Sequence, residues 1–307
     1  MGGSRRMKLQ IMGCHAATPR YVSHPSAQVL EAGKHLLLID CGEGTQMQLR
    51  RYSVRFSRIE HIFISHLHGD HFFGLPGLIT TLRLLGREKP LHVYGPRGIR
   101  EAITLLLKLG DSWTSYPLHF HELDSRDPEV ILQEGPLTVQ TLPLRHRIYT
   151  NGFRVEIAAG ERKLRVEAAR EHGIDKAYYR KIKQGADVPG ADGKMVSNAL
   201  LTDPPPPPTT YAYCSDTAFN PDLVPHIRGV DVLYHESTFL DTEAHLAPKT
   251  GHSTAAQAAR MAREAGVGRL ILGHFSTRYR NLERFREEAA PIFPNVELAA
   301  DGKTFDW

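Results

Sequence analysis

Short apolar runs, separated by glycine, proline and polar residues, recur along most of the chain and predict a protein rich in strands. The runs between residues 118 and 144 alternate between apolar and polar positions, which is typical of antiparallel strands. The expected strands span residues 9–12, 27–30, 36–39, 59–64, 91–94, 118–123, 130–133, 137–144, 153–157, 211–215, 230–234, 270–272 and 296–299.

Apolar residues at helical spacing predict helices between these strands, so the chain is expected to have an α/β fold. Ser253 is the expected N-cap of one helix, because a serine there can accept a hydrogen bond from the first-turn amides. The segment 72–85 carries only Arg83 as a charge, so it is expected either to be deeply buried or to bind a partner. The expected helices span 45–52, 72–85, 98–109, 253–265 and 281–289.

Four of the apolar runs end in histidine or aspartate. Strand ends and their loops meet at one edge of an α/β sheet, so these side chains are expected to converge. Imidazole and carboxylate groups are the ligands that zinc prefers when no thiolate is offered. The candidate ligands are His66, His68, Asp70 and His71 in one loop, and His146, Asp216 and His274 further along. Most other histidines, including His35, His61, His92 and His119, are expected to be ordinary polar residues.

Length and composition favour one soluble domain, residues 7–307, that contains an insertion. The 307 residues are 41% hydrophobic and 23% charged, and the net charge of +4 permits an anionic partner without requiring one. The three cysteines are odd in number and far apart, which fits reduced thiols. No signal peptide or membrane-spanning run is evident, so we expect a cytoplasmic protein with no membrane partner.

The pattern changes in residues 160–208, where charges become dense, apolar periodicity weakens and five prolines, Pro204–Pro208, close the segment. Within it, residues 176–183 interleave four cations with two tyrosines, as a surface that binds phosphates would. The cations are Lys176, Arg180, Lys181 and Lys183. The alternative is a solvated charged loop, since Glu171 and Asp175 dilute the positive charge.

The order His-x-His-x-Asp-His, His, Asp, His resembles the metallo-β-lactamase superfamily, and the surrounding residues resemble its ribonuclease Z family. Those residues are Asp-Cys-Gly-Glu-Gly-Thr-Gln (40–46), the stretch 65–77, His-Glu-Ser-Thr (235–238), Gly-His-Ser-Thr (251–254) and His-Phe-Ser-Thr-Arg-Tyr (274–279). The resemblance implies an αββα sandwich of two mixed sheets flanked by helices, with a flexible tRNA-binding arm at 160–208. It also implies a zinc-dependent endoribonuclease that removes 3′ trailers from precursor tRNA, leaving a 3′-hydroxyl on the tRNA and a 5′-phosphate on the trailer.

The resemblance assigns the seven candidate ligands to two zinc ions. His66, His68 and His146 would hold one ion, Asp70, His71 and His274 the other, and Asp216 would bridge them. Asp40 would orient a ligand histidine from behind. Two zinc ions about 3.5–4 Å apart lower the pKa of a water and neutralise charge on the phosphate.

The resemblance also supplies auxiliary groups. His252, held by Glu236, would donate a proton to the leaving oxygen, whereas its alternative role is to flank a helix cap. Ser276 and Arg278 would bind phosphate, with a surface salt bridge as the alternative for Arg278. Asp70, besides being a ligand, is a candidate for handling the proton of the attacking water.

Several alternatives remain at this stage. A dinuclear zinc phosphodiesterase for other RNA or small phosphodiesters could share the same active site, so the arm is the feature that discriminates. A diiron oxidoreductase would carry a carboxylate in place of His68, so His68 argues against that alternative. An inactive metal-binding scaffold would be expected to have lost a ligand, and all seven are present. Segment 72–85 resembles the family's homodimer contact. Short bacterial members carry a Pro-x-Lys-x-Arg-Asn stretch where this chain has residues 17–25. The resemblance therefore does not imply that this protein rejects tRNAs that already end in CCA.

Overall fold

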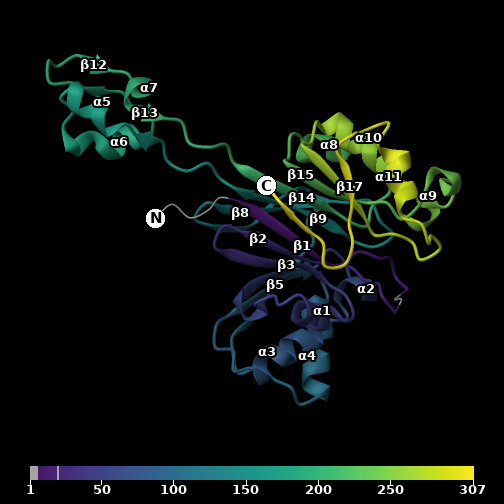
Figure 1. Ribbon diagram of the computed structural model, residues 1–307. Coiled ribbons are helices and arrows are strands. Elements are labelled where there is room, and N and C mark those ends of the chain that lie inside the picture. Colours follow the sequence, from purple (N-terminus) through teal and green to yellow (C-terminus); the bar gives the residue numbers. More distant parts are fainter. Residues whose placement is uncertain (1–5, 19–20) are drawn as a thin grey trace. The chain divides into compact units, whose positions relative to one another are not determined.

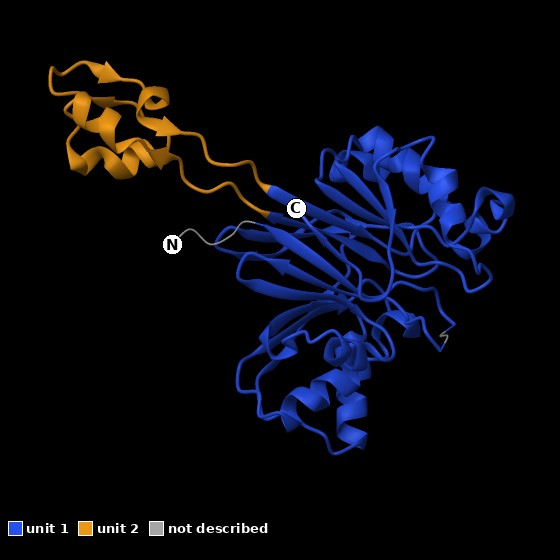
Figure 2. Ribbon diagram, viewed as in Figure 1, with its two compact units in different colours: residues 1–156, 209–307 blue, residues 157–208 orange. Residues whose placement is uncertain are grey.

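The computed structural model describes residues 6–18 and 21–307, and it divides into two compact units. One unit comprises residues up to 156 together with 209–307, and the other comprises 157–208 (Figure 2). Among the described residues, no helix is long and apolar enough to cross a membrane. Cys14, Cys41 and Cys214 are all buried and free, as expected for reduced thiols.

The larger unit contains two seven-stranded sheets, and both are mixed (Figure 1). In the first sheet β1, β2 and β3 are antiparallel, whereas β3, β4, β5 and β6 run parallel. In order across this sheet, the strands are β18 (Thr304–Asp306), β1 (Met7–Gly13), β2 (Ala27–Ala32), β3 (His35–Cys41), β4 (Ile59–Phe63), β5 (Leu91–Pro96) and β6 (Leu118–Leu123).

The second sheet combines a parallel half, from β14 to β17, with an antiparallel β7–β8 pair at its edge. Its order is β17 (Val296–Leu298), β16 (Arg269–Gly273), β15 (Val232–Glu236), β14 (Thr209–Cys214), β9 (Asn151–Ile157), β8 (Leu137–Pro143) and β7 (Val130–Glu134). The two sheets pack face to face, as shown by the rings of Phe63 and Phe153, whose centroids are 5.4 Å apart.

Helices cover the outer face of each sheet. An apolar core packs α1 (Thr45–Arg51), α3 (Leu75–Leu84) and α4 (Ile99–Leu109) against the first sheet. The second sheet is covered by α10 (Ala255–Ala265), with α8 (Val224–Ile227) and α11 (Glu283–Ala289) beside it, and α9 (Ala247–Thr250) lies nearby in the chain (Figure 1). The expected αββα sandwich of two mixed sheets flanked by helices is therefore confirmed.

Two details of the expected secondary structure are wrong. Segment 72–85 is not one helix: α2 (Gly69–Phe72) ends before Gly74, and α3 begins after it. A Cβ on Gly74 would lie 2.2 Å from the carbonyl oxygen of Gly42, so the chain passes too close to its neighbour there for any other residue. Thr254, not Ser253, caps α10, because Thr254 and Gln257 form a reciprocal capping box. The sequence pattern also missed the short strand β18.

The smaller unit, residues 157–208, folds around a small apolar core of its own. Two short strand pairs close it, β10 (Lys163–Leu164) with β13 (Thr202–Asp203), and β11 (Val188–Pro189) with β12 (Met195–Val196). Its helices are α5 (Val166–Glu171), α6 (Tyr179–Lys183) and α7 (Asn198–Leu201). The buried side chains are Ala169, Ile174, Ile182, Val188, Val196 and Leu201. The weak periodicity of this segment reflects the shortness of its elements.

Candidate metal centre

Every candidate ligand lies just beyond the carboxyl end of a strand in the larger unit. The loop and helix after β4 carry His66, His68, Asp70 and His71, and the residues after β8, β14 and β16 are His146, Asp216 and His274. Asp40, near the end of β3, and His274 both adopt a left-handed backbone with φ of 57°. This conformation costs non-glycine residues about 1–3 kcal/mol and is typical of functional sites.

The seven side chains converge as two donor sets. One set comprises His66, His68, His146 and Asp216, and the other comprises Asp70, His71 and His274. Within each set, every residue offers one donor atom that lies within 4.8 Å of the others. Asp216 faces both: its Oδ1 lies 3.5 Å from His71 Nε2 and 3.2 Å from His274 Nε2. Its Oδ2 lies 3.7 Å from His66 Nε2 and 3.9 Å from His146 Nε2. Asp216 thus stands between the two sets with one oxygen toward each.

Hydrogen bonds on the outside of the cluster fix which nitrogen of three histidines carries the proton. His71 Nδ1 donates to Asp40 Oδ2 at 2.7 Å, and His146 Nδ1 donates to the carbonyl oxygen of Gly251 at 2.8 Å. The hydroxyl of Thr238 donates to Glu236 Oε2 at 2.6 Å, so its oxygen accepts from His274 Nδ1, which lies 2.9 Å away. In each neutral ring the proton is on Nδ1, so Nε2 presents a lone pair to the interior of the cluster.

The inward Nε2 atoms of two of these rings have no hydrogen bond to any protein group that the structure describes. His71 Nε2 and His274 Nε2 are buried with no hydrogen-bond partner among the described residues. His68 Nδ1 lies 3.0 Å from His66 Nε2 and 3.3 Å from His146 Nε2, and a single proton cannot serve both contacts. Donor atoms bound at about 2.0–2.1 Å to a tetrahedral ion lie roughly 3.3 Å apart, close to the 3.2–3.9 Å separations around Asp216. The cluster therefore fits divalent metal.

The electrostatics of the cluster also fit a cation. Burial lowers the pKa of His66 well below its ordinary value, which keeps that ring a neutral ligand. Burial alone would raise the pKa of Asp216, but His274, His71 and His66 hold it well below its usual range. Burial opposes protonation of His71 too, yet Asp216 and Asp40 raise its pKa to about 10. A metal ion bound here would take the place of that proton.

Glu236 and His252 form a pair beside the cluster. Glu236 is fully buried and accepts hydrogen bonds from His252 Nδ1 at 2.7 Å, Thr217 N at 2.9 Å and both the amide and hydroxyl of Thr238. Its carboxylate is saturated, so it orients His252 and is not a metal ligand, although it lies within reach of Asp216. Burial opposes protonation of His252, but Glu236 outweighs it and raises its pKa to about 9.

The remaining predicted site residues lie as follows. Arg278 Nε donates to the hydroxyl of Ser276 at 3.2 Å, and its guanidinium lies 5.1 Å from the ring centre of Phe239. Arg278 forms no ion pair in the described part of the chain, so the surface salt bridge is not found. The four cations of the insertion are exposed on the smaller unit, which does not contain the cluster: Lys176, Arg180, Lys181 and Lys183.

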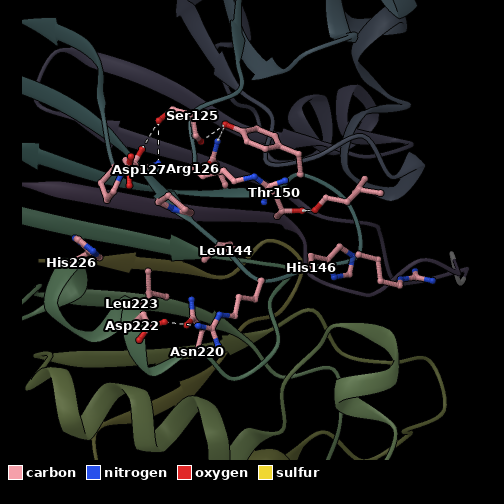
Figure 3. A pocket seen from close by; sticks show the side chains of 17 residues that line it. Ser125, Arg126, Asp127, Leu144, His146, Thr150, Asn220, Asp222, Leu223 and His226 are labelled. Carbon is pink, nitrogen blue, oxygen red and sulfur yellow. Dashed lines mark hydrogen bonds and ion pairs between the residues drawn. The ribbon is translucent and has the colours of Figure 1, made fainter.

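The structure adds groups that the sequence did not single out. A pocket of about 490 Å³ beside His146 is lined by Arg126, Arg145 and Arg147 (Figure 3). Arg145 is paired with Asp222, whereas Arg126 and Arg147 are exposed and form no ion pair with any described residue. The Arg-His-Arg sequence around His146 was the available signal. Within stretch 17–25, of which residues 19–20 lie outside the described chain, the amide of Ala17 donates to Asp70 at 2.8 Å.

Comparison with known proteins identifies the family. Residues 7–123 match the family model described as "Anti-Pycsar protein Apyc1", and residues 206–275 match the "Beta-lactamase superfamily domain". The chain is 44% identical to a ribonuclease Z of Bacteroides fragilis over 296 residues, covering 96% of this chain and 97% of that one. It is also 44% identical to a ribonuclease Z of Porphyromonas gingivalis over 298 residues, covering 97% and 98%.

Solved structures agree with this assignment. The short form of human tRNase Z has a TM-score of 0.71 and 28% identity, covering 97% of this chain and 98% of that chain. The metallo-β-lactamase fold protein YhfI of Bacillus subtilis, at 21% identity and a TM-score of 0.70, supports the fold alone. This fold implies the use of divalent metal, as the His and Asp clusters also indicate. The chain belongs to the ribonuclease Z family, the endoribonucleases of the metallo-β-lactamase superfamily.

Proposed function

We propose that the protein is a zinc-dependent endoribonuclease that removes 3′ trailers from precursor tRNA. The observation that carries this proposal is the convergence of seven donors in two sets around Asp216, in a chain 44% identical to ribonucleases Z over nearly its whole length. The proposed products are a tRNA ending in a 3′-hydroxyl and a trailer bearing a 5′-phosphate. Since precursor tRNA is its substrate, we expect the enzyme to act in the cytoplasm.

We assign two zinc ions to the cluster. His66, His68 and His146 would hold one, Asp70, His71 and His274 the other, and Asp216 would contact both. Bound there, the pair would supply a low-pKa water and neutralise charge that builds up on the phosphate. The hydrogen bond from His71 to Asp40 keeps the Nε2 lone pair of His71 directed at the ion.

The chain's own groups would then handle the protons and the phosphate. Water attacks phosphorus, and the bond from phosphorus to the 3′-oxygen of the tRNA breaks. The His252 imidazolium, stabilised by Glu236, is placed to give its proton to that leaving oxygen. Asp70 is the proposed acceptor of the proton from the water.

Cationic and polar side chains around the cluster would hold the RNA backbone. Ser276 and Arg278 are the proposed contacts to the scissile phosphate, since the guanidinium lies beside the hydroxyl. In the pocket beside His146, Arg126 and Arg147 have no carboxylate partner among the described residues and are available to neighbouring phosphates.

The smaller unit, residues 157–208, is the proposed tRNA-binding arm. Its own apolar core leaves Lys176, Arg180, Lys181 and Lys183 exposed, and Lys181 lies 5.8 Å from the ring of Tyr178. None of these four cations forms an ion pair with a described residue, so their charge is available to phosphates. The arm is the feature that favours tRNA over a small phosphodiester.

We also propose a homodimer. Apolar side chains are exposed along segment 72–85, which resembles the family's dimer contact: Phe73 is 64% exposed, Leu84 77% and Leu85 56%. Helix α4, which packs beside α3, adds exposed Leu105, Leu106 and Leu109. Exposed apolar side chains gathered on adjacent helices are typical of protein–protein contacts.

The direct test is to incubate the purified protein with a 3′-extended precursor tRNA and, separately, with a CCA-ending tRNA, and to map both product ends. We expect cleavage of the precursor with a 3′-hydroxyl on the tRNA and a 5′-phosphate on the trailer. A protein that hydrolyses a chromogenic phosphodiester but leaves precursor tRNA intact would instead be a phosphodiesterase for other substrates. Cleavage of the CCA-ending tRNA would show that stretch 17–25 does not reject finished ends.

A further inference from the structure

A second group of metal-binding side chains lies far from the catalytic cluster. His35 begins β3, whereas Asp40 lies near its other end, five residues or about 17 Å further along the strand. His61 lies in the middle of the neighbouring strand β4. Glu134 ends β7, which is the edge strand of the other sheet. The sequence pattern marked both histidines as ordinary polar residues, but the fold brings them together with a carboxylate.

The three groups have the separations of ligands around a shared ion. One donor atom from each lies within 4.8 Å of the others. Glu134 Oε2 is 3.6 Å from His35 Nδ1, and Glu134 Oε1 is 3.3 Å from His61 Nε2. These distances are too long for a good hydrogen bond to an imidazole, but they match the edge of roughly 3.3 Å between ligands of a tetrahedral zinc ion.

The imidazole of His61 is buried and that of His35 is mostly buried, and each ring has one nitrogen without a protein partner in the described part of the chain. The side chain of His35 is 10% exposed and that of His61 is 4% exposed. His35 Nε2 and His61 Nδ1 are buried with no hydrogen-bond partner among the described residues. These are not the nitrogens that lie nearest Glu134. With the ring protons on them, His35 Nδ1 and His61 Nε2 present lone pairs toward the Glu134 carboxylate, and two lone pairs that face a carboxylate fit a bound cation. Burial also lowers the pKa of both rings, which keeps them neutral and able to bind metal.

The surroundings hold the site rigid while leaving it open to solvent. The rings of His61 and His92 stack with centroids 5.3 Å apart, and His119 stacks on His92 at 4.9 Å, so neighbouring strands hold His61 in place. A pocket of about 280 Å³ opens onto the three groups. Three cations line it. Lys89 is paired with Glu60 at 2.9 Å and Arg58 with Glu31 at 3.8 Å, which reduces their repulsion of a metal ion, and Lys34 is exposed, so solvent screens its charge.

We propose that His35, His61 and Glu134 form a second divalent-metal site, suited to zinc or a similar transition-metal ion. Two imidazoles and one carboxylate leave a coordination position for water, which the open pocket can supply. An ion bound there joins the edge strand of one sheet to two strands of the other. The role of this ion is therefore structural: it stabilises the contact between the two sheets at the end opposite the catalytic cluster.

The test is the number of zinc ions bound per chain after equilibrium dialysis against Zn²⁺, measured for the whole protein and for Glu134→Gln. Glu134 is 44% exposed at its side chain, so this substitution is compatible with folding. We expect one ion fewer per chain in Glu134→Gln, a smaller zinc-dependent rise in melting temperature, and cleavage of precursor tRNA within twofold of the unsubstituted protein. The matched control is Glu129→Gln, another exposed carboxylate next to β7.

A second pair of variants makes the result independent of the catalytic cluster. In an Asp216→Ala background, which disrupts that cluster, Glu134→Gln should still remove one ion. His61→Gln should behave like Glu134→Gln, whereas His119→Gln should not. If Glu134→Gln binds as much zinc as Glu129→Gln in both backgrounds, the site does not exist, whatever the catalytic cluster does.

Discussion

Replacing Asp40 by asparagine tests whether the outer hydrogen bonds prepare the metal ligands. The Asp40 side chain is fully buried and accepts four hydrogen bonds: from Ser65 N at 2.7 Å, Ser65 Oγ at 2.9 Å, His71 Nδ1 at 2.7 Å and Tyr213 Oη at 2.6 Å. Three of the four reach Oδ2. If the amide oxygen of asparagine keeps the contact to Ser65 N, its NH₂ group occupies the Oδ2 position and faces three donors.

The substitution should weaken zinc binding through His71. With a donor in place of Oδ2, His71 can no longer donate through Nδ1, so its proton moves to Nε2 and blocks the lone pair needed for metal. Losing the outer partner of a ligating histidine typically costs about 10–100-fold in metal affinity, or roughly 1.4–2.7 kcal/mol. The unpaired buried groups lower the free energy of unfolding as well, by about 1–3 kcal/mol each.

The assay is competition for zinc with a chromophoric chelator, on protein whose folding is checked by circular dichroism. Tyr213→Phe is the matched control: it removes one donor to Asp40 but keeps the carboxylate and its bond to His71, so its zinc affinity should stay within about threefold of the unsubstituted protein. A folded Asp40→Asn protein that binds zinc within twofold of the unsubstituted protein would refute the proposed role of Asp40.

Three further predictions concern proton transfer, RNA binding and assembly. His252→Ala should lower single-turnover cleavage by about 10²–10⁴-fold with zinc content unchanged; a matching loss of zinc would make His252 a ligand instead of a proton donor. Replacing Lys176, Arg180, Lys181 and Lys183 together by serine should raise KM for precursor tRNA more than it lowers kcat and flatten its salt dependence, while hydrolysis of a small chromogenic phosphodiester survives; unchanged precursor cleavage would show that the arm is not the binding site. Light scattering should give about 69 kDa, twice the 34.4 kDa of the chain, and Leu84→Glu with Leu85→Glu should shift the mass toward the monomer; a monomer mass for the unsubstituted protein at micromolar concentration would contradict the dimer.

The sequence predicted the strands and the seven clustered side chains well, because both depend on local patterns. Apolar runs end where polar residues begin, so the positions of His66, His146, Asp216 and His274 at strand ends follow from the sequence alone. Their convergence followed from a general rule about strand ends. The helix cap was misplaced by one residue, since both serine and threonine can cap and only the partner Gln257 decides between them.

Contacts between distant parts of the chain could not be predicted in the same way. Tyr213 donates a hydrogen bond to Asp40, which lies 173 positions away in the chain, and the sequence around neither residue predicts this contact. The grouping of His35, His61 and Glu134 depends on which strands are neighbours and how the two sheets face each other. The core of the smaller unit was missed because its helices have only four to six residues, too few to show a period.

The central claim is that the seven clustered side chains hold a pair of ions on which cleavage depends. The measurement that tests it most directly is zinc bound per chain in Glu134→Gln with and without Asp216→Ala, because Glu134→Gln leaves only the catalytic cluster to be counted. We predict two ions and active cleavage of precursor tRNA in Glu134→Gln, and one ion or none without cleavage once Asp216 is replaced, since Asp216 faces both donor sets. A fully active Glu134→Gln protein that holds one zinc ion or none would contradict the account.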